Sequence, residues 1–171
     1  AVLAANVAEV NSPAQTIGSA SDTTAPTLTS ITVTNVAAAG TVAATDYVVL
    51  VFSEKIDPTS INSSLTYGNV TPVAISTGTG HLTASTGDAV FTIANIGTID
   101  QGASVTAMSG NTETLSLNAA GTQLTITVAG TVAGGVITTP AASAGVATAG
   151  TVKDAAGNIM PAGSPTATGT F

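Results

Sequence analysis

The sequence predicts an all-β protein, a β-sandwich whose antiparallel strands are connected in Greek-key fashion. β-branched residues and glycine recur along the whole chain, so few windows hold enough helix formers for a long amphipathic helix. Short alternating or fully apolar runs are instead separated by clusters of Gly, Asn, Asp and Pro, at the spacing typical of a sandwich. A length of 171 residues suits one such domain with a single core.

The strands follow from these runs, in order along the chain. We expect them at Thr27–Val36, Tyr47–Ser53, Leu65–Val70, Pro72–Ser76, Ala89–Ile93, Ser104–Met108, Glu113–Asn118, Gln123–Val128, Val146–Lys153 and Pro165–Phe171. A further, poorly defined strand is expected around Val136–Thr138. A helical turn is predicted at Pro58–Ile61, because Asp57 can cap its N-terminus and Pro58 suits the first helical position.

Two of these strands carry clear patterns. Apolar and polar residues alternate within Gln123–Val128, which indicates a strand with one buried face. The turn Asn118–Gly121 before it is expected to close a hairpin with Thr114–Leu117. In contrast, Val48–Phe52 is apolar at every position, which favours a central strand covered on both faces.

The N-terminal segment differs from the rest of the chain. Ala1–Val10 is apolar and strand-like, whereas Asn11–Asp22 has the composition of a linker. We therefore divide the chain into residues 1–24, an extended N-terminal apolar strand with its linker, and residues 25–171, the sandwich. The start at Ala1, without a methionine or a basic region, is typical of a mature secreted chain.

The apolar side chains of this N-terminal strand need a partner surface, and they are Val2, Leu3, Val7 and Val10. An open sheet edge could accept both the backbone and the side chains of the strand, either within the same molecule or in a neighbour. In the second case the contact is donor-strand complementation. Because that contact is head-to-tail, it propagates into a filament.

Composition excludes several classes of function. Charged residues make up 6% of the chain, against about 25% in a typical soluble domain, so hydroxyls and small side chains must cover the surface. Such a surface suits permanent contact with copies of the same protein, although an unusual habitat could also explain it. With a net charge of −7 and only two basic residues, the chain lacks the basic footprint of nucleic-acid binding. It has no cysteine, and no apolar run is long enough to predict a membrane span.

Catalysis is not expected, and neither is a cofactor. His81 is the single histidine and lies in a glycine-rich loop, and no G-x-S-x-G motif accompanies it. Glu54 and Asp57 could form a carboxylate pair for glycoside hydrolysis. The chain has no tryptophan, however, and only five other aromatic residues, 2 Tyr and 3 Phe, with which to bind a sugar. We therefore predict that the protein is not an enzyme.

Calcium binding is the more serious possibility. Acidic residues lie in or beside predicted turns, and the candidate ligands are Asp22, Glu54, Asp57 and Asp154. No contiguous calcium-binding loop motif occurs, so the ligands would come from separate loops, and ordinary capping is the alternative explanation. The triplets that begin at Asn62 and Asn69 are candidate N-glycosylation sites.

Four motifs resemble a known family. They are D-T-T-A-P-T-L-T-S-I at 22–31, V-L-V-F-S-E-K-I-D-P at 49–58, V-K-D-A-A-G-N-I-M at 152–160 and T-A-T-G-T-F at 166–171. In residues, order and spacing they resemble the bacterial Ig-like domains of surface-layer and other cell-surface proteins. The resemblance covers about Asp22 to Phe171 and implies an extracellular Ig-like sandwich, usually one bead of a long chain. This sequence is longer between its central strand and its final turn, and it carries an apolar N-terminal strand of its own.

These observations predict a self-assembling extracellular structural subunit at the cell surface. It would form a pilus-like filament or a surface layer as a homopolymer, with the N-terminal strand joining successive copies. The alternative is a monomeric cell-surface adhesin or ligand-binding module in which the N-terminal strand folds back. An accessory domain of a secreted enzyme is a weaker third interpretation.

Overall fold

The computed structural model describes residues 21–36, 43–69, 73–75, 87–93, 97–105, 112–129, 145–148, 151–163 and 168–169. Their regular elements are strands and a single 3-10 turn, and no α-helix occurs among them. The elements are β1 (Leu28–Thr34), β2 (Tyr47–Phe52), η1 (Pro58–Ser60), β3 (Val73–Ile75), β4 (Gly87–Ile93), β5 (Gly97–Val105), β6 (Thr112–Leu117), β7 (Gln123–Ala129) and β8 (Gly145–Thr148). The all-β class is therefore confirmed.

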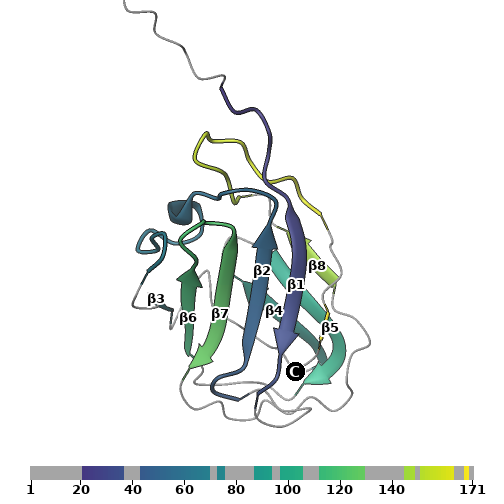
Figure 1. Cartoon of the computed structure of the whole chain (residues 1–171). Helices are drawn as coiled ribbons and strands as arrows, with labels where there is room; N and C mark the ends of the chain where they lie inside the picture. Colours follow the sequence, from purple (N-terminus) through teal and green to yellow (C-terminus); the bar gives the residue numbers. More distant parts are fainter. Residues whose placement is uncertain are drawn as a thin grey trace, which may run out of the picture.

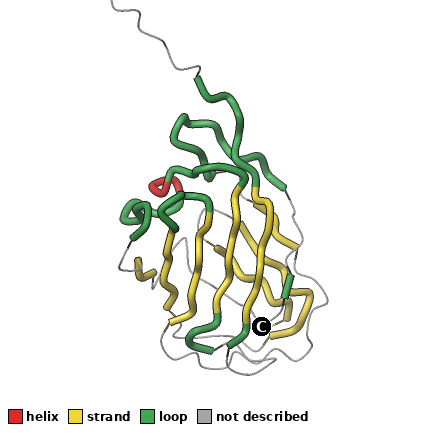
Figure 2. The backbone as a smooth tube through the Cα atoms, viewed as in Figure 1, coloured by secondary structure: helices red, strands yellow, loops and turns green. Residues whose placement is uncertain are grey.

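The strands form two antiparallel sheets. A five-stranded sheet has the order β1-β2-β7-β6-β3, and a three-stranded sheet has the order β4-β5-β8. In Figure 1 the five-stranded sheet faces the viewer and the other sheet is drawn behind it. η1 and the loops next to it lie at the end of the molecule where residues 21–27 lead into β1, as Figure 2 also shows. The described loops that carry Asp22, Glu54, Asp57 and Asp154 also gather at this end, whereas the loop of Asp46 lies before β2 at the opposite end.

One face of the five-stranded sheet forms the core. Ile31 of β1 pairs with Leu50 of β2, which pairs with Leu124 of β7, and all three side chains have no exposed surface. Alternate residues of each strand point the other way and remain partly exposed. The alternation predicted for Gln123–Val128 is thus confirmed.

β2 is a central strand, as predicted, but the expected burial of both its faces is wrong. Val48, Leu50 and Phe52 are buried, whereas Val49 and Val51 are only half-buried. The cross-strand neighbours of Val49 are Thr32 and Thr125, so the second face of the sheet is a mixed surface of Thr and Val. Apolar composition alone did not reveal this, because valine suits a half-exposed strand position as well as a buried one.

The predicted hairpin between β6 and β7 is present. The Asn118 N–H donates to the Gln123 carbonyl over 3.0 Å, and the side-chain oxygen of Asn118 accepts hydrogen bonds from the backbone N–H groups of Thr122 and Gln123. Gly121 has a φ of +75°, and a Cβ there would lie 2.6 Å from Cε1 of Tyr67. The turn therefore requires glycine for both its conformation and its packing.

Several strand boundaries differ from those predicted. Residues 65–69 of the expected strand Leu65–Val70 form turns, because the Asn62 carbonyl accepts the Leu65 N–H and Gly68 has a φ of +59°. β5 begins at Gly97, earlier than expected, and the predicted strand Val146–Lys153 ends as β8 at Thr148. The expected strands at Ala1–Val10 and Val136–Thr138 lie outside the described residues.

The last described residues run alongside β1. Thr168 forms a parallel bridge with Thr32, in which the Val33 N–H donates to the Thr168 carbonyl and the Thr168 N–H donates to the Ile31 carbonyl. This bridge is the described part of the strand predicted at Pro165–Phe171, and Phe171 itself is outside the described residues. The outer edge of β1 is therefore paired within the same molecule at this point.

Candidate metal centre

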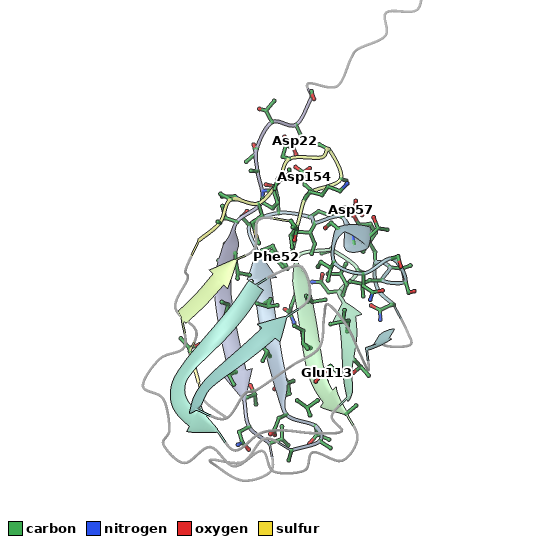
Figure 3. All side chains as sticks on the ribbon, turned by 180° about the vertical axis from the view of Figure 1, so that it is seen from behind. Asp22, Phe52, Asp57, Glu113 and Asp154 are labelled. Atoms are coloured by element: carbon green, nitrogen blue, oxygen red, sulfur yellow. The ribbon has the colours of Figure 1, made fainter. Side chains whose placement is uncertain are left out.

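Three acidic residues from distant parts of the sequence meet where the chain leads into β1. Asp22 belongs to the leading segment, Glu54 follows the end of β2, and Asp154 begins the turn Asp154–Asn158. One carboxylate oxygen of each residue lies within 4.8 Å of the others. Figure 3 shows Asp22 and Asp154 together at this end of the molecule. We call these three residues the acidic cluster.

Asp154 is the fixed member of the cluster. Its side chain is 2% exposed, and its two carboxylate oxygens accept hydrogen bonds from the backbone N–H and the side-chain amide of Asn158, over 2.8 and 2.7 Å. Burial alone would raise the pKa of Asp154, but hydrogen bonds from Asn158, Gly157 and Ala156 outweigh burial and lower it. Asp154 is therefore held as a carboxylate in a set position.

Asn158 also connects the cluster to the leading segment. Its side-chain amide donates to the backbone carbonyl of Asp22 over 3.0 Å, and a carboxylate oxygen of Asp22 accepts the Thr24 N–H. Gly157, at a φ of +96°, allows the turn that brings Asn158 back to Asp154. The sequence analysis expected Asp154 in or beside a turn, which is confirmed, but the role of Asn158 in orienting two acidic residues was missed. The recurrence of Asp and Asn within D-A-A-G-N is the signal that could have indicated it.

Glu54 is the uncompensated member of the cluster. Its oxygen Oε1 is inaccessible to solvent and has no hydrogen-bond partner. Burial, together with the charges of Asp22 and Asp154, raises the pKa of Glu54 above its ordinary value. A buried carboxylate oxygen without a donor is costly, so this position favours either a proton or a cation.

The two lysines of the chain do not neutralise the cluster. Nζ of Lys55 lies 4.0 Å from the ring centroid of Tyr67, and Nζ of Lys153 lies 3.9 Å from a carboxylate oxygen of Asp57. The sequence contains no arginine. Compensation by a lysine or an arginine is therefore absent at the cluster, and the three carboxylates can accommodate a cation from solution.

Asp57 is not part of this cluster, although the sequence analysis grouped it with the other three. Its carboxylate accepts the backbone N–H and the hydroxyl of Thr59, which makes it the N-cap of η1 as predicted. Figure 3 shows Asp57 at η1, away from Asp22 and Asp154. The structure thus brings together three of the four proposed calcium ligands.

Comparison of the chain with protein-family models, curated proteins and solved structures found no match. Among the described residues, no helix has the length and apolar character needed to cross a membrane. The site must therefore be interpreted from its own geometry.

The remaining candidate residues fall into two groups. Asn62 is half-buried and accepts the Ser64 N–H, whereas the side chain of Asn69 joins the Leu115 carbonyl and the Leu117 N–H of β6. The Asn69 amide therefore has a structural role in the folded protein. The proposed interface residues Val2, Leu3, Val7 and Val10, and also His81, lie outside the described residues.

The pKa of Glu54 predicts how stability depends on pH in the absence of divalent cations. Because this pKa is raised in the folded state, the folded protein binds a proton before the unfolded chain does, so stability increases as the pH falls towards 4.5. Asp154 acts in the opposite direction, because its lowered pKa stabilises the fold above 3.8 and this contribution is lost at lower pH. Urea unfolding in EDTA between pH 7 and pH 3 is therefore expected to show a maximum.

The variant Glu54→Gln isolates this effect. It removes one of three mutually repelling charges at nearly constant volume, so its urea midpoint at pH 7 in EDTA is expected to exceed that of the wild type. Its stability is also expected to stay flat between pH 7 and pH 5. A wild type whose stability fell steadily over this range would contradict the role assigned to Glu54.

Proposed function

We propose that this chain is an Ig-like, Greek-key β-sandwich that serves as a structural subunit of an extracellular filament or surface layer. Successive copies are joined when the strand Ala1–Val10 of one copy completes a sheet of the next. The fully buried face of the five-stranded sheet supports the sandwich part of this proposal, because another layer must cover such a face.

The direction of the chain at its two described ends carries the functional proposal. Residues 21–27 lead into β1 at the end of the molecule that holds the acidic cluster (Figure 1). Thr168 and Gly169 run parallel to β1, so the chain there heads towards the opposite end. The chain thus enters the described body at one end and runs towards the opposite end at residues 168–169. This arrangement suits a linear, head-to-tail assembly of copies.

The outer face of the five-stranded sheet supports contact between copies. One row across it contains Thr32, Val49, Thr125 and Ser116, all of which are half-buried or exposed. No outward-facing described side chain of β1, β2, β6 or β7 is charged. Two copies, each with a net charge of −7, can contact each other through such a face without bringing like charges together and without burying an ion.

The sheet edges limit where a donated strand can add. The outer edge of β1 already holds Thr168. Within the described part of the chain, β3 pairs only with β6, and β4 and β8 pair only with β5, so the outer edges of these three strands are the positions that we propose as acceptors. A strand added there would gain backbone hydrogen bonds worth roughly 0.5–1.5 kcal/mol each.

Removal of residues 1–10 tests strand donation. We expect negative-stain electron microscopy to show filaments or sheets for the full chain and only monomers for the truncated chain. A synthetic peptide of residues 1–10 is expected to bind the truncated chain in isothermal titration calorimetry, which would show that an acceptor groove remains folded.

A pair of matched variants separates side-chain docking from chain length. Serine at positions 2, 3, 7 and 10 is expected to abolish assembly, whereas serine at the alanine positions 4, 5 and 8 is expected to preserve it. Assemblies that persist without residues 1–10 would refute strand donation. A full chain that stayed monomeric at every concentration would instead support the adhesin.

A further inference from the structure

The acidic cluster has two independent properties that point to a ligand. Three carboxylates converge without a lysine or arginine between them, and Oε1 of Glu54 is fully buried without a hydrogen-bond donor. Folding has therefore removed this carboxylate oxygen from water without giving it a hydrogen-bond donor. A single cation between them would satisfy all three carboxylates at once.

The spacing of the oxygens allows all three carboxylates to contact a single cation. Calcium binds oxygen ligands at 2.3–2.6 Å, so two ligands on opposite sides of the ion lie about 4.8 Å apart. The cluster oxygens of Asp22, Glu54 and Asp154 lie within that distance of one another. Asp22 is exposed, so water can supply the remaining ligands on the outer side. Calcium tolerates such irregular, partly hydrated coordination, whereas magnesium requires near-octahedral geometry at about 2.0–2.1 Å.

We propose that Asp22, Glu54 and Asp154 bind one calcium ion, and that this ion fastens the segment leading into β1 to the turn Asp154–Asn158. In its absence, the described polar link between these two segments is the hydrogen bond from the Asn158 amide to the Asp22 carbonyl, which spans 136 residues of sequence. The ion bridges the carboxylate of Asp22 to the carboxylates of Glu54 and Asp154.

Calcium binding therefore fixes the direction in which residues before Asp22 leave the body. Where the chain acts as a linear subunit, as proposed above, this direction sets the angle between successive copies. That consequence depends on the proposed function, but the binding of calcium does not. A monomeric protein would bind the ion through the same three side chains.

Calorimetric titration of the metal-stripped full chain tests the site. We expect one calcium ion per chain, with a dissociation constant in the range of about 0.1–1 mM typical of extracellular modules. Calcium at about 10 mM is expected to raise the midpoint of thermal unfolding more than magnesium at the same concentration. Hydrogen exchange of the backbone amides of Thr23, Thr24, Ala25 and Thr27 is expected to slow at least tenfold on calcium binding.

Two single substitutions sharpen the test. Glu54→Gln relieves repulsion and is expected to fold well, yet to weaken calcium binding at least tenfold. Asp57→Asn removes an acid at the same end of the molecule but outside the cluster, and is expected to bind calcium as the wild type does. The absence of binding at 10 mM calcium, or unchanged binding by Glu54→Gln, would overturn the site. An equal response to magnesium would overturn the choice of ion. These readouts come from the monomer, so a failure to assemble leaves them interpretable.

Discussion

Leu50→Ala is expected to lower the free energy of unfolding by about 2–5 kcal/mol. Leu50 has no exposed surface, and its cross-strand neighbours Ile31 and Leu124 are equally buried. Truncation therefore leaves a cavity in the middle of the row that joins β1, β2 and β7. Because small domains are stable by only about 5–15 kcal/mol, this loss is a large fraction of the total. Urea unfolding followed by circular dichroism measures it.

Val49→Thr is the matched control on the same strand. Val49 points to the outer face between Thr32 and Thr125 and is half-buried, so the added hydroxyl can reach water. We expect its effect to stay within about 1 kcal/mol. A loss as large as that of Leu50→Ala would show that the outer face of the sheet is covered after all.

Asp46→Ala is the second substitution expected to have a large effect, about 2–4 kcal/mol. Asp46 precedes β2 and has no exposed surface, and its two carboxylate oxygens accept the N–H groups of Val36 and Ala43 over 2.8 and 2.7 Å. The preceding residue, Thr45, has a φ of +84°, which is unfavourable for a β-branched side chain. The Asp46 carboxylate therefore stabilises a strained turn, and its removal leaves two N–H groups without their acceptor.

Asp46→Asn is the control for this prediction. An asparagine retains one acceptor oxygen and nearly the same volume, so we expect a smaller loss of stability than with alanine. Equal unfolding midpoints for Asp46→Ala and the wild type, measured in urea, would show that water replaces the carboxylate. The role of Asp46 in the turn would then be refuted.

The features of the fold that depend on local chemistry could be predicted from the sequence. Alternation identified β7, the Asn118–Gly121 turn identified the hairpin, and Asp57-Pro58 identified η1. The exposed second face of β2 could not be predicted, because Val49 and Val51 are apolar wherever they point. The strand predicted at Leu65–Val70 failed for another reason, since the hydrogen bond from the Leu65 N–H to the Asn62 carbonyl and the positive φ of Gly68 replace it with turns.

The candidate site likewise has features that the local sequence predicts and features that depend on contacts between distant segments. The acidic residues were visible in the sequence because they lie beside turns, and three of them do converge. Asp57 is also an acidic residue beside a predicted turn, but it caps η1 and lies outside the cluster. The role of Asn158 requires Asp22 and Asp154 to be adjacent, and a sequence does not state which of its turns meet.

The parallel bridge between Thr32 and Thr168 has a consequence for the order of folding. The hydrogen bond from the Thr168 hydroxyl to the Ile31 carbonyl joins residues 137 positions apart, so the outer edge of β1 is completed by residues far along the chain. Contacts of such long range form slowly, because a large loop must close before they contribute. During synthesis this edge of β1 therefore stays open until residue 168 has left the ribosome.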